Sequence, residues 1–310
     1  MSKKNIGRIA LFAAAILWGV SFVAMKSVLT NIPTLYVLAI RFCGAALILL
    51  PACARKLKEI DRQHIFFSVT LGVVLFLAYV FQTYGLRLTT PGKNAFLTSA
   101  YCIIVPFLYW ALSAAGSAYR KRIRKGPGGA ERPIRKPDKF NVAAAAVCVA
   151  GIGLISLEND FSIGAGDALT IACGFFFAIQ IVVISGAVEN RDPILVAMLQ
   201  FAAAGVITLV CAFIFEAPPT TVTASDIWIM AFLTVVSTAV CIVLQIIGQK
   251  YTPPSQAAVI LTLESVFGAV SSAIIFHEVM TLRLVAGFAL TFAAVIISEV
   301  KPRFSRRRTS

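Results

Sequence analysis

Two charged side chains, Arg41 and Glu264, lie inside long apolar stretches of this 310-residue chain. If those stretches cross a membrane, a charge near the bilayer centre costs about 2.5–3.5 kcal/mol, so each charge should face protein or water. Arg41 could attract anionic groups in a cavity, or it could tie helices together through carbonyl groups or a buried carboxylate. Glu264 could exchange a proton or bind a substrate amine, or it could pair with Arg41 and lock helix packing. The residues alone leave both choices open.

Two neutral amides, Gln82 and Gln245, belong to a segment that occurs twice. Residues 81–91 read FQTYGLRLTTP and residues 244–254 read LQIIGQKYTPP, at an offset of 163. Tyr79 lies three residues before Gln82 and therefore on the same helical face. These side chains could line the two halves of one cavity, or they could form interhelical hydrogen bonds, worth only about 0.6 kcal/mol on average in a membrane.

The first apolar stretch carries a stripe of side chains at helical spacing, consisting of Trp18, Ser21, Phe22 and Met25. Its counterparts at an offset of 159 include Phe177 and Gln180. The stripe could be ordinary packing, or it could line the same cavity as the amides. The residues that we predict to line a substrate-binding cavity are Trp18, Ser21, Arg41, Tyr79, Gln82, Tyr101, Phe177, Gln180, Gln245 and Glu264.

The composition indicates which elements position these side chains. Hydrophobic residues make up 59% of the chain and charged residues only 14%, whereas a soluble domain carries roughly 45–50% and 25%. The apolar residues form runs of about 20, the length that crosses a bilayer as a helix. Helices are required because every backbone polar group in lipid must bond within its own segment. We predict spans at roughly 6–25, 34–54, 64–86, 93–115, 139–157, 164–185, 193–215, 225–248, 255–276 and 281–299.

The basic residues predict an orientation. With the N-terminus inside, 23 Lys and Arg residues fall on that side and 4 on the other, which is the bias of cytoplasmic loops. We therefore predict a multi-pass protein of the plasma (bacterial inner) membrane with both termini in the cytoplasm. A basic cytoplasmic linker, 116–138, could be a solvated loop or could bind anionic lipid headgroups. The net charge of +14 thus needs no nucleic acid as a partner.

The doubled segment predicts two related halves, a first five-helix repeat at 1–162 and a second at 163–310. Because each half has an odd number of spans, the second enters the membrane the opposite way up, as an inverted repeat. Tyr101 aligns with Glu264 at the offset of 163, so the two should face each other across the pseudo-two-fold axis. Pro106 should kink the fourth span. Glu278 should lie at a solvated helix end.

Enzyme chemistry finds no support in the residues. No phosphate-binding G-x-x-x-x-G-K-[ST] segment occurs, and no H-E-x-x-H zinc motif. The seven cysteines lie in or beside apolar runs without a C-x-x-C pair, and the chain has two histidines. We predict no enzyme activity, no cofactor and no metal site.

Four stretches together resemble the drug/metabolite transporter superfamily, and specifically its ten-helix EamA-type members. They read LFAAAILWGVSFV, LAIRFCGAALILLP, GLRLTTPGKNAFLTSAYCIIVP and GQKYTPPSQAAVILTLESVFGAVSSAIIFHEVMT. The last is similar to a family pattern that often has proline where this chain has Ser265. The resemblance covers nearly the whole chain and implies an all-α fold of ten transmembrane helices, two inverted five-helix repeats around a central cavity.

The resemblance also implies a function. We expect a secondary transporter that exports small organic metabolites, amino acids or similar, across the plasma membrane by alternating access. Its partners would be a small-molecule substrate and the lipid bilayer. Proton coupling through Glu264, or no coupling at all, stays open, as does the oligomeric state. The alternative class is a membrane scaffold or sensor that transports nothing.

Overall fold

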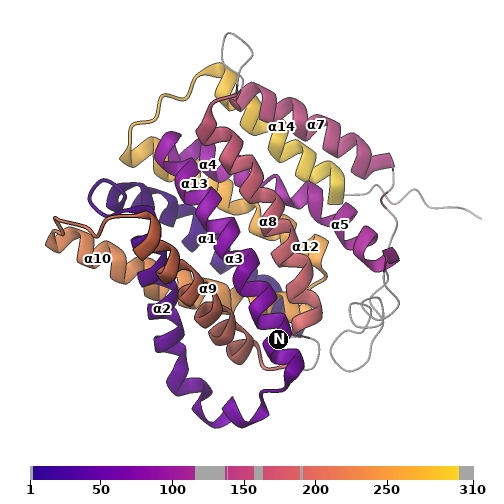
Figure 1. Ribbon diagram of the computed structural model, residues 1–310. Coiled ribbons are helices and arrows are strands. Elements are labelled where there is room, and N and C mark those ends of the chain that lie inside the picture. Colours follow the sequence, from indigo (N-terminus) through magenta and orange to yellow (C-terminus); the bar gives the residue numbers. More distant parts are fainter. Residues whose placement is uncertain (1–2, 116–136, 138, 157–162, 189–190, 300–310) are drawn as a thin grey trace, which may run out of the picture.

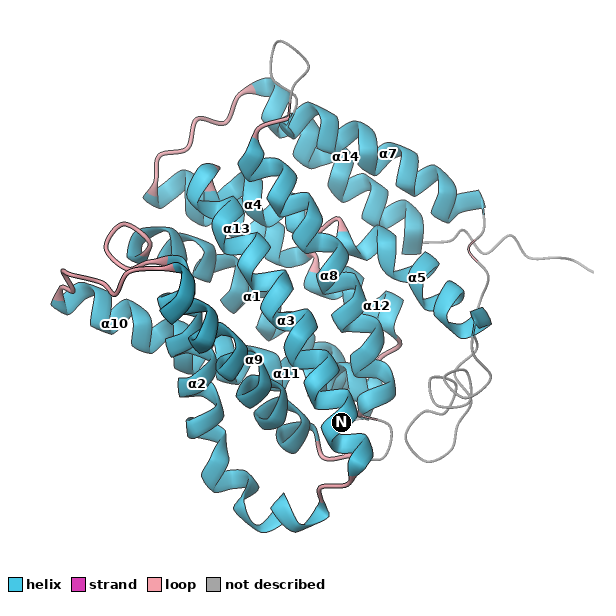
Figure 2. Cartoon of the chain, viewed as in Figure 1, coloured by secondary structure: helices cyan, strands magenta, loops and turns pink. Residues whose placement is uncertain are grey.

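The computed structural model describes residues 3–115, 137, 139–156, 163–188 and 191–299, and its labelled elements there are all helices (Figures 1 and 2). The predicted basic linker, 116–138, lies outside the described residues except for Pro137. The prediction of an all-helical membrane fold is confirmed.

The first half of the chain supplies α1 (Lys3–Val28), α2 (Thr34–Cys53), the 3-10 turn η1 (Ala54–Glu59), α3 (Arg62–Leu88), α4 (Pro91–Thr98), α5 (Tyr101–Ala115) and α7 (Lys139–Ser156). The second half supplies α8 (Ala165–Ala187), α9 (Pro193–Phe215), α10 (Ala224–Phe232), the π-helical segment η3 (Leu233–Val240), α11 (Cys241–Tyr251), α12 (Pro254–Leu261), α13 (Leu263–Ile275) and α14 (Leu282–Glu299).

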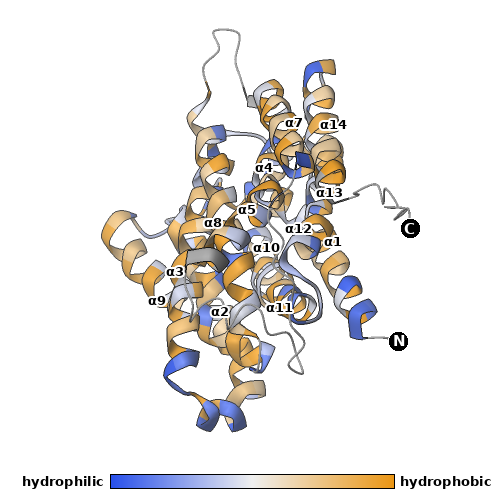
Figure 3. Cartoon of the chain, turned by 90° about the vertical axis from the view of Figure 1, so that its right-hand side faces the viewer, coloured by the Kyte–Doolittle hydropathy of each residue, from blue (hydrophilic) through white to orange (hydrophobic). Residues whose placement is uncertain are grey.

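Among the described residues, 8 helical segments are long and apolar enough to cross a membrane. The helices α7 and α14 are shorter and also apolar, and together they complete the ten predicted spans. Figure 3 shows hydrophobic residues over the lengths of the helices and hydrophilic residues gathered at their ends. This distribution is the one a bilayer requires, because lipid tails contact the middle of each helix.

Two of the predicted spans are broken in the middle. The fourth span changes from α4 to α5 at Ser99 and Ala100, and the ninth changes from α12 to α13 at Thr262. At each break a hydroxyl bonds the carbonyl four residues earlier, from Ser99 to Ala95 (2.8 Å) and from Thr262 to Ala258 (2.7 Å). Such side-chain bonds compete with the helical ladder. The two breaks are related by the same offset as the doubled segment.

The break in the fourth span does not lie at Pro106. Pro106 lies inside α5, and the interruption of the span comes before that helix begins. The break coincides with a turn whose backbone bonds run from Ala100 N to Leu97 O and from Cys102 N to Ser99 O. Neither proline nor glycine occupies the break, so the sequence gives no strong local signal for it.

Close glycine contacts reveal how the two halves are related. A Cβ added to Gly85 on α3 would lie 2.9 Å from the carbonyl oxygen of Gly166 on α8. A Cβ added to Gly248 on α11 would lie 2.9 Å from that of Gly7 on α1. The sequence offsets relate the two contacts, because Gly85 corresponds to Gly248 and Gly166 corresponds to Gly7. We call the end of the bundle at the first contact the Thr89 end, and the end at the second contact the Gly7 end.

Helices also pair across the pseudo-two-fold axis. The helix α2 packs along α9, its own counterpart, and α7 packs along α14 in the same way. Figure 1 shows α7 and α14 side by side at one edge of the bundle, away from α2 and α9. The cores of the two halves are therefore continuous, and buried side chains from both form the main hydrophobic cluster.

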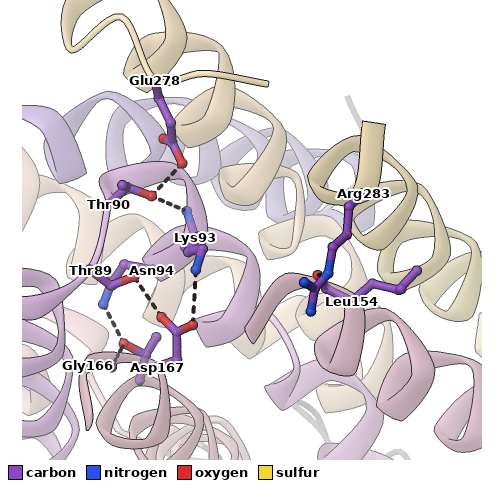
Figure 4. Close-up of polar contacts among 10 residues, drawn as sticks. Thr89, Thr90, Lys93, Asn94, Leu154, Gly166, Asp167, Glu278 and Arg283 are labelled. Atoms are coloured by element: carbon purple, nitrogen blue, oxygen red, sulfur yellow. Dashed lines mark hydrogen bonds and ion pairs between the residues drawn. The ribbon is translucent and has the colours of Figure 1, made fainter. Parts of the chain in front are cut away.

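Polar contacts link neighbouring helices at the Thr89 end (Figure 4). The Asp167 carboxylate accepts bonds from the Thr89 hydroxyl (2.6 Å) and the Lys93 ammonium (3.4 Å). Glu278 accepts bonds from the Thr90 hydroxyl and from the Gly92 backbone N–H (3.2 Å). The expectation that Glu278 is simply a solvated helix end is wrong, because its carboxylate holds the first turn of α4.

Candidate functional site

A cavity lies among α1, α2, α3, α8, α11 and the two broken spans, and it extends from the middle of the bundle toward the Thr89 end. It is lined by Trp18, Ser21, Phe22, Met25, Arg41, Tyr79, Gln82, Thr83, Leu86, Thr98, Tyr101, Phe177, Ile181, Gln245, Leu261 and Glu264. The cavity volume is about 40 Å³, which is room for roughly three water molecules. An organic solute would need it to widen.

The cavity brings together nine of the ten side chains named from the sequence. The exception is Gln180, which is fully buried and does not line it. The set named from the sequence omitted seven lining residues, which are Phe22, Met25, Thr83, Leu86, Thr98, Ile181 and Leu261. Helical spacing is the signal that finds most of them, since they follow Trp18, Gln82 and Phe177 by one to seven positions along a helix.

Arg41 reaches into this cavity from α2 and is held by the second half of the chain. Its Nε donates to the Thr238 hydroxyl at 2.9 Å, and its Nη2 donates to the Ser237 hydroxyl at 3.3 Å. The guanidinium also lies over the Tyr79 ring, 4.9 Å from the centroid, a favourable cation–π arrangement. Arg41 is only 3% exposed, yet its partners are neutral.

The π-helical turn of η3 makes these contacts available. Its wider spiral appears where the Thr238 hydroxyl bonds the Leu233 carbonyl, five residues earlier (2.7 Å). The Ser237 carbonyl accepts a bond from the Trp18 indole N–H at 2.8 Å. A π-bulge of this kind inside a helix frees backbone groups and often occurs at functional sites.

Glu264 lies opposite Tyr101, where the two broken spans meet. The Tyr101 hydroxyl donates to the Glu264 carboxyl at 3.1 Å, which confirms the facing positions that the offset predicts. Tyr101 begins α5 and Glu264 is the second residue of α13. The first turn of a helix leaves backbone N–H groups unpaired and favours an anion, so the break itself helps to accommodate the carboxyl group.

The alternative of an Arg41–Glu264 ion pair is not observed. Ion pairs within the described part of the chain are Lys56–Asp192, His64–Asp61 and Lys93–Asp167, all away from the cavity. Arg41 and Glu264 thus lie on different walls of the cavity, and they do not form an ion pair with each other.

Several glutamine side chains surround this arrangement. Gln82 donates to the Thr98 hydroxyl at 3.3 Å. Gln245, on the cavity wall, leaves its buried Oε1 without a hydrogen-bond partner in the described residues. Both amide atoms of Gln180 and of Gln200 are likewise buried and unpaired there. An unsatisfied buried polar group costs about 1–3 kcal/mol, so these amides are not explained by stability.

The cavity combines groups that together suit a small organic solute with both polar and apolar parts. Arg41 can attract a carboxylate or other anionic group, and Glu264 can take up a proton or bind an amine. Trp18, Tyr79 and Phe177 supply aromatic surface beside them. No group of three His, Cys, Asp or Glu side chains suited to a metal occurs in the ranges that the structure covers.

Comparisons with known proteins match most of the chain. A sequence model of the EamA-like transporter family matches residues 5–115 and 164–299. An uncharacterized transporter of Archaeoglobus fulgidus is 28% identical over 297 residues, which is 96% of this chain and 87% of that protein. The uncharacterized transporter YoaV of Bacillus subtilis is 23% identical over 97% of this chain and 98% of its own length.

A solved crystal structure has a closely similar fold. Its TM-score is 0.67 at 16% sequence identity, and the match covers 95% of this chain and 96% of the other. At this identity the likeness concerns the arrangement of the helices alone.

Proposed function

The chain belongs to the EamA-like transporter family, and from that premise we propose that it is a secondary transporter that moves a small organic metabolite by alternating access. It is thus a multi-pass membrane transporter from a family of transporters, not of enzymes. The observation that carries the finer proposal is the cavity at the two broken spans, where Arg41 and Glu264 lie without an ion-pair partner in the described residues. Broken helices at the interface of inverted repeats are where such proteins bind their substrates.

The solute class follows from the cavity walls. An arginine, a carboxyl group and five aromatic side chains suit amino acids or similar metabolites, whose carboxylate would meet Arg41. Aromatic surface beside a cation contributes both apolar contact and orientation. The narrow cavity indicates that the solute binds as the helices move apart.

Glu264 is the group that we propose couples transport to protons. Its carboxyl is 5% exposed and bonded to Tyr101, so it is shielded from water until the cavity opens. A carboxyl group in this setting can exchange its proton with the side that the cavity faces. Proton uptake on one side and release on the other would then drive solute movement.

The direction that we propose is export across the plasma membrane, with both termini in the cytoplasm. The 23-to-4 asymmetry of Lys and Arg supports this orientation. It places the Thr89 end outside and the Gly7 end inside.

Flux in proteoliposomes tests the proposal. The purified full chain would be reconstituted and offered a panel of radiolabelled amino acids and related metabolites, with and without an imposed proton gradient. We expect saturable flux of at least one solute, driven against its gradient by protons. Absence of flux for every solute, with intact fold and orientation, would favour the scaffold or sensor alternative.

Glu264→Gln separates coupling from transport. The amide keeps the size of the side chain and can still bond Tyr101, but it cannot release a proton. We expect this variant to lose proton-driven accumulation while it still exchanges labelled for unlabelled solute. Proton-driven accumulation that survives in the variant would refute the coupling role.

A further inference from the structure

Resting on the proposed function, we infer that the chain holds a second substrate vestibule, collapsed in this structure, which is lined by Gln180, Gln200 and Gln249 at the Gly7 end. Its ligand is the same organic solute, contacted there through neutral amides instead of the Arg41 guanidinium. The two vestibules would open in turn, so during export a solute would enter past the glutamines, bind beside Arg41 and leave at the Thr89 end.

The placement follows from the repeat. Six residues of the first half line the cavity on its way to the Thr89 end, and they are Ser21, Met25, Arg41, Tyr79, Thr83 and Leu86. Their counterparts at offsets of 159 and 163 are Gln180, Ile184, Gln200, Ile242, Ile246 and Gln249. None of these six counterparts lines the cavity, and each has an exposed fraction of 0%.

Two further pairs locate the boundary between the vestibules. Phe22 and its counterpart Ile181 both line the cavity, and so do Gln82 and its counterpart Gln245. These pairs therefore lie at the centre, where either vestibule would reach them. The same offsets relate the glycine contacts at the two ends of the bundle. The correspondence therefore holds for backbone positions in the structure as well as for the sequence.

The collapsed vestibule carries polar groups that its packing does not use. Gln180 and Gln200 each bury a whole amide with neither atom hydrogen-bonded among the described residues. Buried amides are normally paired, and leucine would fill the same space without the loss. Groups kept in this state are expected where another conformation supplies their partners.

Contacts within the second half of the chain keep this vestibule closed. The Gln249 amide donates to the Ile181 carbonyl at 3.2 Å, which ties α11 to α8. The Lys250 ammonium donates to the Arg191 carbonyl at 3.3 Å. Its counterpart Arg87 makes the equivalent contact at the Thr89 end, to the Leu29 carbonyl at 3.2 Å. Opening would break the first two contacts and expose the glutamines to solute.

The chemistry of the two vestibules differs in one respect that affects transport. Arg41 offers a fixed positive charge, whereas amides both donate and accept hydrogen bonds and carry no charge. A carboxylate-bearing solute would thus be held more weakly beside the glutamines, where it enters during export, than beside Arg41.

Cysteine labelling tests the vestibule without any knowledge of the solute. Gln180→Cys and Gln249→Cys would be made in the full chain, each beside its first-half counterpart, Ser21→Cys and Leu86→Cys. A membrane-impermeant maleimide would be added to right-side-out and to inverted membrane vesicles, with the unsubstituted protein measuring labelling of its native cysteines. We expect the two pairs to label from opposite sides, each at least about tenfold faster from its own side.

The result that overturns the inference is labelling of Gln180→Cys and Gln249→Cys from neither side, or from the same side as their counterparts. Because labelling needs no flux, this result is distinct from failure of the proposed function. Gln200→Leu provides a second measurement. We expect flux to fall about tenfold, the equivalent of one hydrogen bond, while the melting temperature is unchanged or raised. A lowered melting temperature with unchanged flux per folded molecule would show a purely structural amide.

Discussion

The two five-helix halves of this protein share a backbone plan and differ in the chemistry of their cavity walls. Arg41 in the first half corresponds to Gln200 in the second. Arg41 contacts the π-helical segment η3, whereas the residues that correspond to η3 belong to the regular helix α3. Tyr79 and Thr83, which line the cavity, correspond to isoleucines.

The positions that stay alike in both halves hold the scaffold. Gly85 and Gly248 keep helices in close contact, and the breaks at Ser99 and Thr262 recur at equivalent positions. The positions that differ include the cavity-lining residues Arg41, Tyr79 and Thr83. The repeat thus supplies a symmetric frame, and the substitutions make the two halves of the cavity wall chemically unequal.

The largest effect should come from adding the missing charge to the second half. Gln200→Arg places a guanidinium at a fully buried position that lacks the π-helical hydroxyls around Arg41. Such a charge costs about 2.5–3.5 kcal/mol in a helix centre, so the folded yield and the melting temperature in detergent should fall sharply. Gln200→Leu is the matched control, and neither its folded yield nor its melting temperature should fall. Equal stability of the arginine variant and the parent would mean that the two positions are equivalent after all.

The next largest effect should come from replacing the arginine of the first half with the glutamine of the second. Arg41→Gln removes the cavity cation and its bonds to Ser237 and Thr238. A hydrogen bond to a charged group contributes about 1.5–3 kcal/mol, so affinity for a carboxylate-bearing solute should fall at least about tenfold. Competition assays with a solute and its carboxamide measure this. If the solute and its carboxamide both bind the variant as tightly as they bind the parent, Arg41 does not contact the anionic part of the solute.

Symmetric glycine substitutions test the shared frame. Gly85→Ala and Gly248→Ala each push a methyl group to within 2.9 Å of a backbone carbonyl, and overpacking of this kind costs about 1–3 kcal/mol. Both variants should lose similar melting temperature. Gly174→Ala is a milder control, since its Cβ would meet its nearest atom at 3.1 Å. A large loss at only one of the two glycines would show that the frame is less symmetric than the contacts indicate.

The smallest effect should concern the starts of α2 and α9, which correspond to each other. Asp192 caps α9 through the Ile194 and Leu195 N–H groups and pairs with Lys56 at 2.5 Å. The equivalent residue of α2 is Pro33, which has no side-chain cap; there Glu216 bonds the Leu35 N–H at 2.6 Å. Burial alone would raise the pKa of Asp192, but Lys56 and the two N–H groups outweigh it and hold the pKa below its usual range.

Asp192→Asn keeps a capping side chain and removes the charge. Because the folded pKa lies below the unfolded value of about 3.9, the stabilisation is present above that pH and lost as pH falls through the folded pKa. The variant should melt slightly lower at neutral pH, and the difference should vanish in strongly acidic buffer. The effect is small because the pair is partly exposed. A difference that grows in acid would contradict this account.

Much of the fold could be predicted from sequence because membrane spans have strong signals. The length of the apolar runs predicts the spans, and the doubled segment around Gln82 and Gln245 predicts the repeat. The breaks at Ser99 and Thr262 could not be predicted, since a hydroxyl that bonds a carbonyl in a helix is common and rarely breaks it. Pro106 is the stronger local signal in that span, and the break does not lie there. The π-helical turn of η3 also has no distinct residue pattern.

The cavity was predictable where polarity conflicts with a membrane setting. Arg41, Glu264 and Gln245 are conspicuous in apolar runs, and the offset placed Tyr101 beside Glu264. Gln180 shares that polarity, yet it is fully buried and does not line the cavity. Thr83 and Leu86 are ordinary residues in a membrane helix, and only their helical spacing from Gln82 could have indicated them.

The pairing of α7 with α14 has a consequence for the covalent chain itself. These last helices of the two halves pack against each other through the close approach of Gly151 and Thr291, where an added Cβ would lie 2.5 Å from the hydroxyl oxygen. The peptide connection between the halves is therefore not what joins them. Two polypeptides, each with five helices, should therefore assemble into the same bundle when they are produced together.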